Sequence, residues 1–373
     1  MIHRYHLIYL FLLMVILSSC DSEHSSASWT NWGGNLKANP QKIWYPKDLN
    51  ELKQIVQEAH TKNINVHPYG SGHSWSDLVP TDGYMINTRH LNRPITIDLE
   101  KKQVQVEAGM SLGDLNALLD KHGLALANVG RIYSQSIAGL TATGTHGTGH
   151  TPSVSSFITG AELLTANGSL LTISEQENPE LLPAIRLSLG GLGVIYSLTL
   201  QCVDSFFLSS RQYIDDLKGV LKKYPDNFKD HDFWMFEWNP YTDKTLCYAW
   251  DRTEEKPQKS FWRTSVNVFK EGLHSFFTVI LKPFPSAMPS LIDFRFRLSV
   301  KDQNIDKSYQ ALSRRFKGLR YVESEWAVES SLLPKAIDKL KGLFQEYEAK
   351  GVYATRVSFR SVSQEPQTLL SPN

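Results

Sequence analysis

Residues 70–77 have the composition of a loop that binds an anion. They read GSGHSWSD and follow a short strand-like run at 64–67. Glycines let a backbone approach a ligand closely, and successive N–H groups in a tight turn form an anion-binding nest. His73, which follows the two glycines, can bond to whatever the nest holds. The loop therefore predicts a phosphate-bearing cofactor, with His73 as the candidate for a covalent attachment.

Two further loops are rich in glycine and hydroxyl side chains. Residues 134–139 read SQSIAG and lead into TGTHGTG at 143–149, and LGGLGVI follows at 189–195. Hydroxyl and free N–H groups suit a pyrophosphate and the edge of a polar ring. The alternative for each loop is a turn that needs glycine only for a positive φ. Three such loops in one domain favour a shared ligand.

The first loop does not fit a Rossmann dinucleotide site. Gly70 and Gly72 match the first two glycines of the GxGxxG motif, but Trp75 stands where the third belongs. Asp82 and Gly83 follow too soon for a long helix to open there. A cofactor at this loop must be held by another fold.

Several motifs together resemble one family of flavoproteins. They are VxPYGSGHSWSD from residue 66, VEAG from 106, LDKHGLAL from 119, SIAG from 136, GTHGTG from 144 and LGVIxxxTLQC from 192. The chain resembles the vanillyl-alcohol-oxidase-type flavoproteins, and within them the sugar-1,4-lactone and alditol oxidases, D-arabinono-1,4-lactone oxidase included. The resemblance runs in order through residues 39–204 and continues more weakly to about residue 372.

The resemblance implies an FAD cofactor and names its contacts. It makes His73 the residue bonded covalently to the 8α carbon of the flavin. It implies further FAD contacts for Gly70, Ser71, Gly72, Ser74, Asp77, Ser136, Gly139, Gly144, Thr145, His146, Gly147, Thr148, Val194 and Ile195. For His146, a flavin-facing ring and a ring that only stabilises its loop are equally compatible with the sequence.

The resemblance also places a catalytic pair on one strand near the end of the chain. In the family this strand reads Glu-x-Arg shortly before Leu-Ser-Pro, and here it reads VSFRSV at 357–362 before LSP at 370–372. Arg360 matches the arginine, which would stabilise negative charge beside the flavin, unless it is only an exposed strand charge. Ser358 stands where the glutamate is expected. A carboxylate polarises a substrate hydroxyl, whereas serine can only form a hydrogen bond to it.

The activity that this family implies is oxidation of a CH–OH group of a sugar lactone or polyol. FAD would accept the hydride, and dioxygen would reoxidise it. One alternative is a dehydrogenase of the same family that passes electrons to a membrane acceptor. The other is a catalytically impaired FAD-binding lipoprotein, which Ser358 favours. Family members continue past Leu-Ser-Pro with a segment that supplies a histidine and a lysine, so we expect a sequence ending at Asn373 to be a fragment.

The first 20 residues resemble a bacterial lipoprotein signal peptide. A weak positive region at Arg4 precedes an apolar run at 7–17, too short to span a bilayer, and LSSC ends it at Cys20. We expect Cys20 to be lipidated, with residues 21–38 as a polar tether. The alternative is an ordinary signal peptide cleaved near the serines. Either way the sequence predicts an exported protein, and the first alternative anchors it to the cell-envelope membrane.

The elements that must position these loops form an α+β domain over residues 39–204. Helical spacing at 46–63 precedes the first loop, and Ser111 can cap a helix that Gly123 ends. Strand patterns stand at 84–87, 95–98, 103–107 and 194–202, with a hairpin at 157–173 through an Asn-Gly turn. This is the predicted FAD-binding domain.

Residues 205–373 predict a second α+β domain with an antiparallel sheet, C-terminally incomplete. The composition becomes aromatic, strands are expected at 233–238 and 245–250, and an amphipathic helix at 332–347. The region 276–292 contains a short apolar run that ends at Leu281, before prolines interrupt it, and is either a core element or a surface patch near the lipid. The resemblance implies that this domain shapes the substrate pocket.

Composition excludes several other classes. A net charge of +1 over 373 residues with no basic block leaves nucleic-acid binding without an electrostatic basis. Three cysteines cannot make a disulfide framework. Cys202 and Cys247 could pair with each other, but each stands in a strand-like run, so we expect buried free thiols. No metal site is expected.

Overall fold

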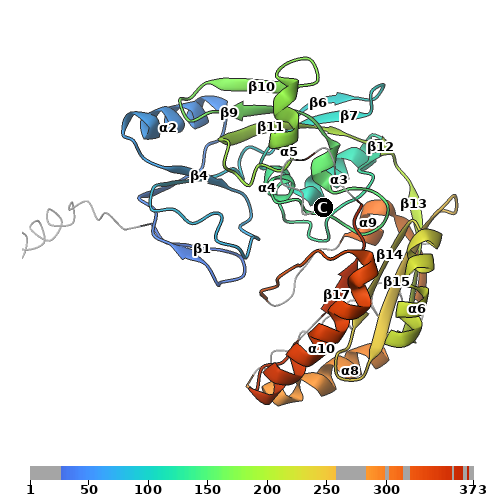
Figure 1. Ribbon diagram of the computed structural model, residues 1–373. Coiled ribbons are helices and arrows are strands. Elements are labelled where there is room, and N and C mark those ends of the chain that lie inside the picture. The colour runs from blue at the N-terminus through green and yellow to red at the C-terminus, as the bar shows by residue number, and fades with distance from the viewer. Residues whose placement is uncertain are drawn as a thin grey trace, which may run out of the picture.

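The computed structural model describes residues 27–257, 283–298, 302–313, 320–354, 357–363 and 368. The chain forms two units, an N-terminal one with two main sheets and a second one built on a single antiparallel sheet, which meet near the middle of the view in Figure 1. The predicted α+β fold with antiparallel sheets is confirmed. The predicted signal peptide, Cys20 and the Leu-Ser-Pro motif lie outside the described residues.

A small parallel sheet brings three loops to one edge. Its strand order is β3-β5-β4, with bounds β3 (Lys42–Trp44), β5 (Tyr84–Asn87) and β4 (Val66–Tyr69). The helix α2 (Leu49–Thr61) packs an apolar face against it, and the Asp48 side chain caps that helix by accepting a hydrogen bond from the Glu51 N–H. Because the strands run parallel, the loops that follow all three strands leave from the same edge.

A five-stranded antiparallel sheet forms the rest of the N-terminal unit. Its order is β10 (Leu170–Ser174), β9 (Ile158–Leu164), β11 (Val194–Gln201), β7 (Gln103–Glu107) and β6 (Pro94–Asp98). Its helices are α3 (Leu112–Lys121), α4 (Ile137–Ala142) and α5 (Leu182–Arg186). The predicted hairpin is β9 and β10, and the predicted cap is formed, since Ser111 accepts from the Asp114 N–H at 3.1 Å. One apolar core joins the sheet to the three helices.

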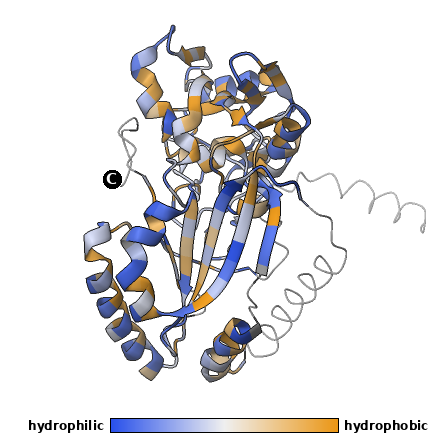
Figure 2. Cartoon of the chain, turned by 90° about the vertical axis from the view of Figure 1, so that its right-hand side faces the viewer, coloured by the Kyte–Doolittle hydropathy of each residue, from blue (hydrophilic) through white to orange (hydrophobic). Residues whose placement is uncertain are grey.

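The second unit is one twisted antiparallel sheet with helices on both faces. Its order is β16 (Asp302–Lys307), β13 (Phe207–Asp216), β15 (Lys244–Thr253), β14 (Phe233–Trp238) and β17 (Val357–Arg360). Figure 2 shows these strands side by side between helices. The helices α6 (Leu217–Asp230) and α10 (Leu333–Ala349) bury one face, and α8 (Met288–Leu298) and α9 (Ser308–Leu312) contribute to the apolar cluster on the other.

Side chains alternate between these faces, which decides what β14 and β17 present to the N-terminal unit. Trp234, Phe236 and Phe359 belong to the cluster under α6 and α10. Met235 and Arg360, which are register partners, therefore belong to the opposite face. On that face α8 buries Ile292 and Phe296. The predicted apolar run that ends at Leu281 lies outside the described residues.

The remaining elements are short. They are β1 (Trp29–Thr30), β2 (Lys37–Ala38), β8 (Leu124–Ala125), β12 (Val203–Asp204), and the 3-10 turns η1 (Val154–Phe157), η2 (Pro179–Leu181), η3 (Pro285–Ala287) and η4 (Ser330–Leu332). Cys202 and Cys247 are free and buried, as predicted. None of the helices in the described ranges combines the length and the apolar character that a membrane span requires.

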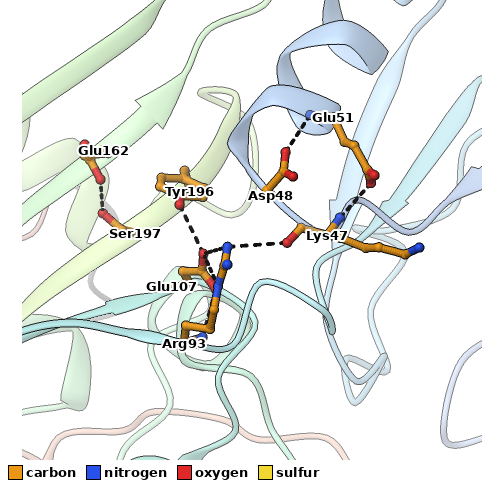
Figure 3. A network of polar contacts seen from close by, with 8 residues as sticks. All are labelled: Lys47, Asp48, Glu51, Arg93, Glu107, Glu162, Tyr196 and Ser197. Carbon is orange, nitrogen blue, oxygen red and sulfur yellow. Dashed lines mark hydrogen bonds and ion pairs between the residues drawn. The ribbon is translucent and has the colours of Figure 1, made fainter.

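A buried carboxylate joins β7 to the rest of the N-terminal unit (Figure 3). Glu107 is only 1% exposed, and it accepts hydrogen bonds from the Arg93 N–H at 2.8 Å, the Arg93 guanidinium at 2.8 Å and the Tyr196 hydroxyl at 3.0 Å. Burial alone would raise the pKa of Glu107, but these hydrogen bonds outweigh it and leave the pKa below its usual value. The ionised carboxylate thus ties β7 to β11 just before the chain turns toward Gly109.

Replacing Glu107 with alanine is expected to lower the free energy of unfolding by about 3 kcal/mol, because the Tyr196 hydroxyl and the Arg93 N–H groups lose their buried acceptor. Since the folded-state pKa is lowered, this loss is fully present above pH about 4.5 and shrinks as the pH falls. Urea unfolding at pH 7 and pH 4 measures it. The control E346Q removes only the exposed Lys350 pair and should leave the midpoint unchanged. Equal midpoints for E107A and wild type would show that the network adds nothing.

Candidate active site

A cavity of about 530 Å³ opens at the carboxyl edge of the parallel sheet. Each of the three strands contributes to its lining through the loop that follows it. The lining includes Tyr45 after β3, Gly70, Ser71 and Gly72 after β4, and Asn87 and Arg89 at and after β5, with Gly109 and Ser136 from the neighbouring sheet and helix. Gly70 and Ser136, 66 residues apart in the sequence, thus meet at this cavity, whereas the predicted loops at 143–149 and 189–195 contribute nothing to its described lining.

The first glycine loop is held against the second polar segment. A β-carbon on Gly70 would lie 1.8 Å from the Ser136 hydroxyl oxygen, so only glycine fits there. The Asn87 amide donates to the Gly70 carbonyl at 3.4 Å, and the Ser71 hydroxyl donates to the Ser134 carbonyl. These contacts keep the loop backbone at the cavity wall.

Arg89 gives this cavity a positive charge, and the sequence analysis did not single it out. Its Nε donates to Asn87 Oδ1 at 3.1 Å, and its guanidinium lies 4.6 Å from the centre of the Tyr45 ring. A guanidinium next to backbone N–H groups is a favourable place for a diphosphate. The signal was present in the sequence, because Arg89 follows directly on a strand that is parallel to the one carrying the glycine loop.

His73 lies next to this wall and is itself buried. Its Nε2 is 3.0 Å from the Ser134 hydroxyl, and its ring is 4.7 Å from that of Trp32. Its Nδ1 is buried and has no hydrogen-bond partner within the described residues. Burial lowers the pKa of His73 to about 4, so the imidazole is neutral at physiological pH. An unpartnered nitrogen of a neutral imidazole is free to form a bond to a ligand.

An aromatic cluster connects His73 to the second unit. The Trp75 indole N–H donates to the Tyr321 carbonyl at 2.9 Å, and the Tyr321 ring lies 5.5 Å from Trp75 and 5.2 Å from Trp32. Tyr321 begins the irregular segment 320–329, which leads into α10. This segment therefore starts beside the histidine of the N-terminal unit.

The second glycine loop, residues 144–149, lies against β14 and β17 rather than along the described cavity lining. The Thr148 hydroxyl donates to the Trp234 carbonyl, and the Gly149 N–H donates to the Ser361 carbonyl at 3.2 Å. Gly149 has φ +103°, and a β-carbon there would lie 2.4 Å from the Asp232 carbonyl. Gly149 thus lets the two units approach each other closely.

Three charged or ionisable side chains meet at this boundary. Glu325 Oε1 lies 2.7 Å from Arg360 Nη2 and 3.2 Å from His146 Nε2. The guanidinium of Arg360 also donates to the His146 carbonyl at 3.4 Å. Burial by itself would raise the pKa of Glu325, but the His146 hydrogen bond and the Arg360 charge hold it at about 2. Arg360 is therefore a paired charge with a side chain only 20% exposed, which rules out the alternative of a free strand charge.

Ser358 lies on the same face of β17 as Arg360 and is exposed. Its register partner on β14 is Glu237, which is 1% exposed and pairs with Arg295 from α8. The carboxylate next to Ser358 is thus already paired to a cation. Glu325, which comes from a different segment, was not among the predicted site residues.

The third loop and the outer residues of the first one lie away from the cavity lining. Val194 and Ile195 are buried in two apolar clusters, where they pair with Leu164 and Leu163 of β9. The loop before them bonds to the second polar segment, since the Leu189 N–H donates to the Ala142 carbonyl at 2.9 Å. The remaining predicted contacts lie within or next to the loops described above and stay predictions: Ser74, Asp77, Gly139, Gly144, Thr145 and Gly147.

The residues present fit an FAD. The cavity has room and one cation for a diphosphate, and its wall is glycine backbone. Beside the cavity wall lies a neutral histidine with an unpartnered nitrogen, and a paired arginine lies at the boundary of the units. A phosphate cradle, a histidine with a free nitrogen and a paired cation suit a cofactor that carries both a diphosphate and a redox-active ring.

Known families match both units of the chain. Residues 40–174 match the family described as FAD binding domain, and residues 198–371 match the family described as D-arabinono-1,4-lactone oxidase. The chain is 32% identical to the L-gulonolactone oxidase of Bos taurus over 328 residues, 86% of this chain and 74% of that one. It is 32% identical to the L-gulono-1,4-lactone dehydrogenase of Mycobacterium tuberculosis over 337 residues, 90% of this chain and 78% of the other.

Solved structures share the fold. A cholesterol oxidase from B. sterolicum superimposes with a TM-score of 0.70 at 17% identity, over 89% of this chain and 71% of that one. At this identity the likeness concerns the fold alone. The sequence relatives go further, because they match both units at 32% identity over most of their length. The chain therefore belongs to the family of FAD-dependent sugar-1,4-lactone oxidoreductases that includes the L-gulonolactone oxidases.

Proposed function

We propose that the protein oxidises a CH–OH group of a sugar 1,4-lactone, with dioxygen as the final electron acceptor. One observation carries this proposal: the glycine-lined cavity and His73 lie in the N-terminal unit, and Arg360 of the second unit reaches the loop of His146. Relatives with the same two-unit organisation are named for the oxidation of such lactones. An alditol is a second substrate class with the same reacting group.

The chain supplies binding, orientation and electrostatics to this reaction. When bound, FAD accepts a hydride from the carbinol carbon. Arg89 and the backbone of Gly70 and Gly72 would hold its diphosphate. Arg360 places a fixed positive charge where negative charge develops, in a position that Glu325 and the His146 carbonyl determine. The Ser358 hydroxyl lies one step away on the same face and can donate or accept a hydrogen bond to a sugar hydroxyl.

Anaerobic mixing with a panel of aldonolactones and alditols tests the activity. We expect bleaching of the flavin absorbance by at least one lactone. A protein that binds FAD but is bleached by no member of the panel would be the impaired flavin-binding protein instead.

Oxidase and dehydrogenase activities remain to be separated, because one close relative is named as a dehydrogenase. Hydrogen peroxide should form in air at the rate of lactone consumption if dioxygen is the acceptor. Turnover that appears only with a quinone or dye would identify a dehydrogenase.

We further propose that FAD is attached covalently to His73, through Nδ1. This nitrogen is buried and unpartnered, whereas Nε2 faces the Ser134 hydroxyl. If Ser134 accepts the Nε2 proton, the lone pair of the neutral ring lies on Nδ1. Ser134 would thus set the tautomer of His73.

Replacing Ser134 with alanine is expected to slow covalent attachment about fivefold, which is the effect of losing one hydrogen bond of about 1 kcal/mol. Non-covalent FAD binding should persist, because the cavity wall is unchanged. In-gel flavin fluorescence after a timed incubation of the FAD-free protein measures the covalent fraction. S134T keeps the hydroxyl and should behave as wild type. An S134A rate equal to that of wild type would remove Ser134 from the reaction.

We also propose that the protein is exported and anchored through a lipid on Cys20, and the sequence LSSC after an apolar run supports this. Labelled palmitate should enter the full-length protein when it is expressed in a bacterial host. C20S should lose the label and leave the membrane fraction. Label in C20S would contradict the proposal.

A further inference from the structure

Alcohol oxidation needs an acceptor for a proton, and β17 supplies none. Each oxidation removes a hydride from carbon, which FAD accepts, and a proton from oxygen. Ser358 is a neutral hydroxyl and Arg360 is a permanent cation, so neither can take that proton. The acceptor must come from another segment, and this step rests on the proposed function.

Among the described residues, two carboxylates are placed beside this pair by pairing or contact. Glu237 is the register partner of Ser358, but it is 1% exposed and pairs with Arg295. Glu325 has a side chain that is 54% exposed, and it contacts Arg360 directly. Because it is accessible to a substrate and to water, Glu325 is favoured over Glu237 as the proton acceptor.

The two oxygens of Glu325 are engaged differently. Oε1 makes both contacts, to Arg360 Nη2 at 2.7 Å and to His146 Nε2 at 3.2 Å. Within the described part of the chain, Oε2 accepts no hydrogen bond. Arg360 and His146 therefore hold the carboxylate in place while one oxygen remains for a further donor.

The position of Glu325 along the chain brings it near the cofactor residues. Tyr321 is anchored to Trp75 and lies against Trp32, which in turn packs on His73. Four residues span at most about 14 Å, so Glu325 lies within that reach of the aromatic cluster. The segment 320–329 thus stretches from the histidine of the N-terminal unit to the arginine of the second unit.

We propose that Glu325 is a catalytic residue, whose Oε2 accepts the hydrogen bond of the substrate hydroxyl that is oxidised and receives its proton. As the C–H bond breaks and its electron pair leaves as a hydride to FAD, the O–H bond breaks and a C=O bond forms. Because His146 and Arg360 hold the pKa of Glu325 at about 2, the carboxylate keeps this proton only briefly and passes it to water. Glu325, on the segment between the two units, would accept the proton that Ser358 on β17 cannot accept.

E325Q tests this, with E329Q as its matched control on the same segment, because Glu329 is exposed and its carboxylate accepts a hydrogen bond from the nearby Ser331 hydroxyl. The flavin-reduction rate with a reactive lactone, measured by anaerobic stopped flow, should fall at least about 100-fold in E325Q and stay within twofold in E329Q. Folding and covalent FAD should be unaffected, as the flavin spectrum and the thermal midpoint report.

Two further readouts separate a catalytic role from a structural one. The dissociation constant of the same lactone for enzyme photoreduced under argon, where no turnover occurs, should rise about tenfold in E325Q, since a charge-assisted hydrogen bond is lost. Adding S358E to E325Q should restore part of the reduction rate by returning a carboxylate to the site.

The outcomes are distinct. A reduction rate in E325Q within threefold of wild type overturns the inference, and so does a slower rate with unchanged lactone affinity and no restoration by S358E. If wild type itself is reduced by no lactone or alditol, the proposed function fails instead.

Discussion

H73A is expected to lose all covalently bound FAD while it still binds FAD reversibly. His73 carries the unpartnered buried nitrogen next to the cavity, whereas the diphosphate cradle consists of Gly70, Gly72 and Arg89, which the substitution leaves in place. Mass spectrometry of the peptide that contains residue 73 should show the flavin adduct in wild type only. Denatured H73A should release its yellow colour into the filtrate.

H122A is the matched control, because His122 is exposed at the end of α3 and far from the cavity lining. It should retain the covalent flavin in full. Flavin that stays on denatured H73A would mean that another residue forms the bond, and the assignment of His73 would be wrong.

The rate of covalent attachment should also have a pH dependence that differs from that expected for an exposed histidine. Burial lowers the pKa of His73 to about 4, so the neutral, nucleophilic ring persists well below pH 6.5. The rate of attachment should be level from about pH 8 to pH 5 and fall with a midpoint near 4. Between pH 6.5 and 4, His73 is protonated in the unfolded chain but not in the folded protein. A fall in pH should therefore lower the free energy of unfolding of FAD-free wild type more than that of H73A.

R360A is expected to slow flavin reduction by about 100- to 1,000-fold, the usual cost of removing a preorganised group that stabilises developing charge. Arg360 suits this role because its side chain is mostly buried and is fixed by Glu325 and by the His146 carbonyl. R360K should recover part of the rate, since lysine keeps the charge but cannot reproduce the two-sided contact. Anaerobic stopped flow with a reactive lactone measures both.

R211A serves as the control for R360A, since Arg211 is exposed on β13 of the same sheet. Its reduction rate should match wild type. If R360A were also unchanged, Arg360 would only join the two units, and the charge stabilisation would have to come from elsewhere.

The local elements of this protein were predictable because each has its cause in neighbouring residues. Ser111 and Asp114 define the start of α3, and the Asn-Gly pair defines the turn between β9 and β10. Alternating and helical apolar patterns likewise identified most of the strands and α10. Such signals act over a few residues, so a single sequence displays them fully.

The sequence also identified the glycine loop and His73, because close backbone approach to a ligand restricts residue type. Gly70 is the clearest case, since any β-carbon there would collide with Ser136. Arg360 was found only through resemblance, because an isolated arginine on a strand has no distinguishing local pattern.

Tertiary structure alone decided which distant residues complete the site. Arg89 joins the glycine loop only because β4 and β5 run parallel and end at the same edge. Glu325 reaches Arg360 across 35 residues of sequence because the segment anchored at Trp75 crosses between the units. The sequence by itself determined the cofactor loop and the serine at position 358, since steric limits and side-chain chemistry are properties of single residues. Which segment brings a carboxylate to Arg360 depends on the path of the chain, and long-range packing determines that path.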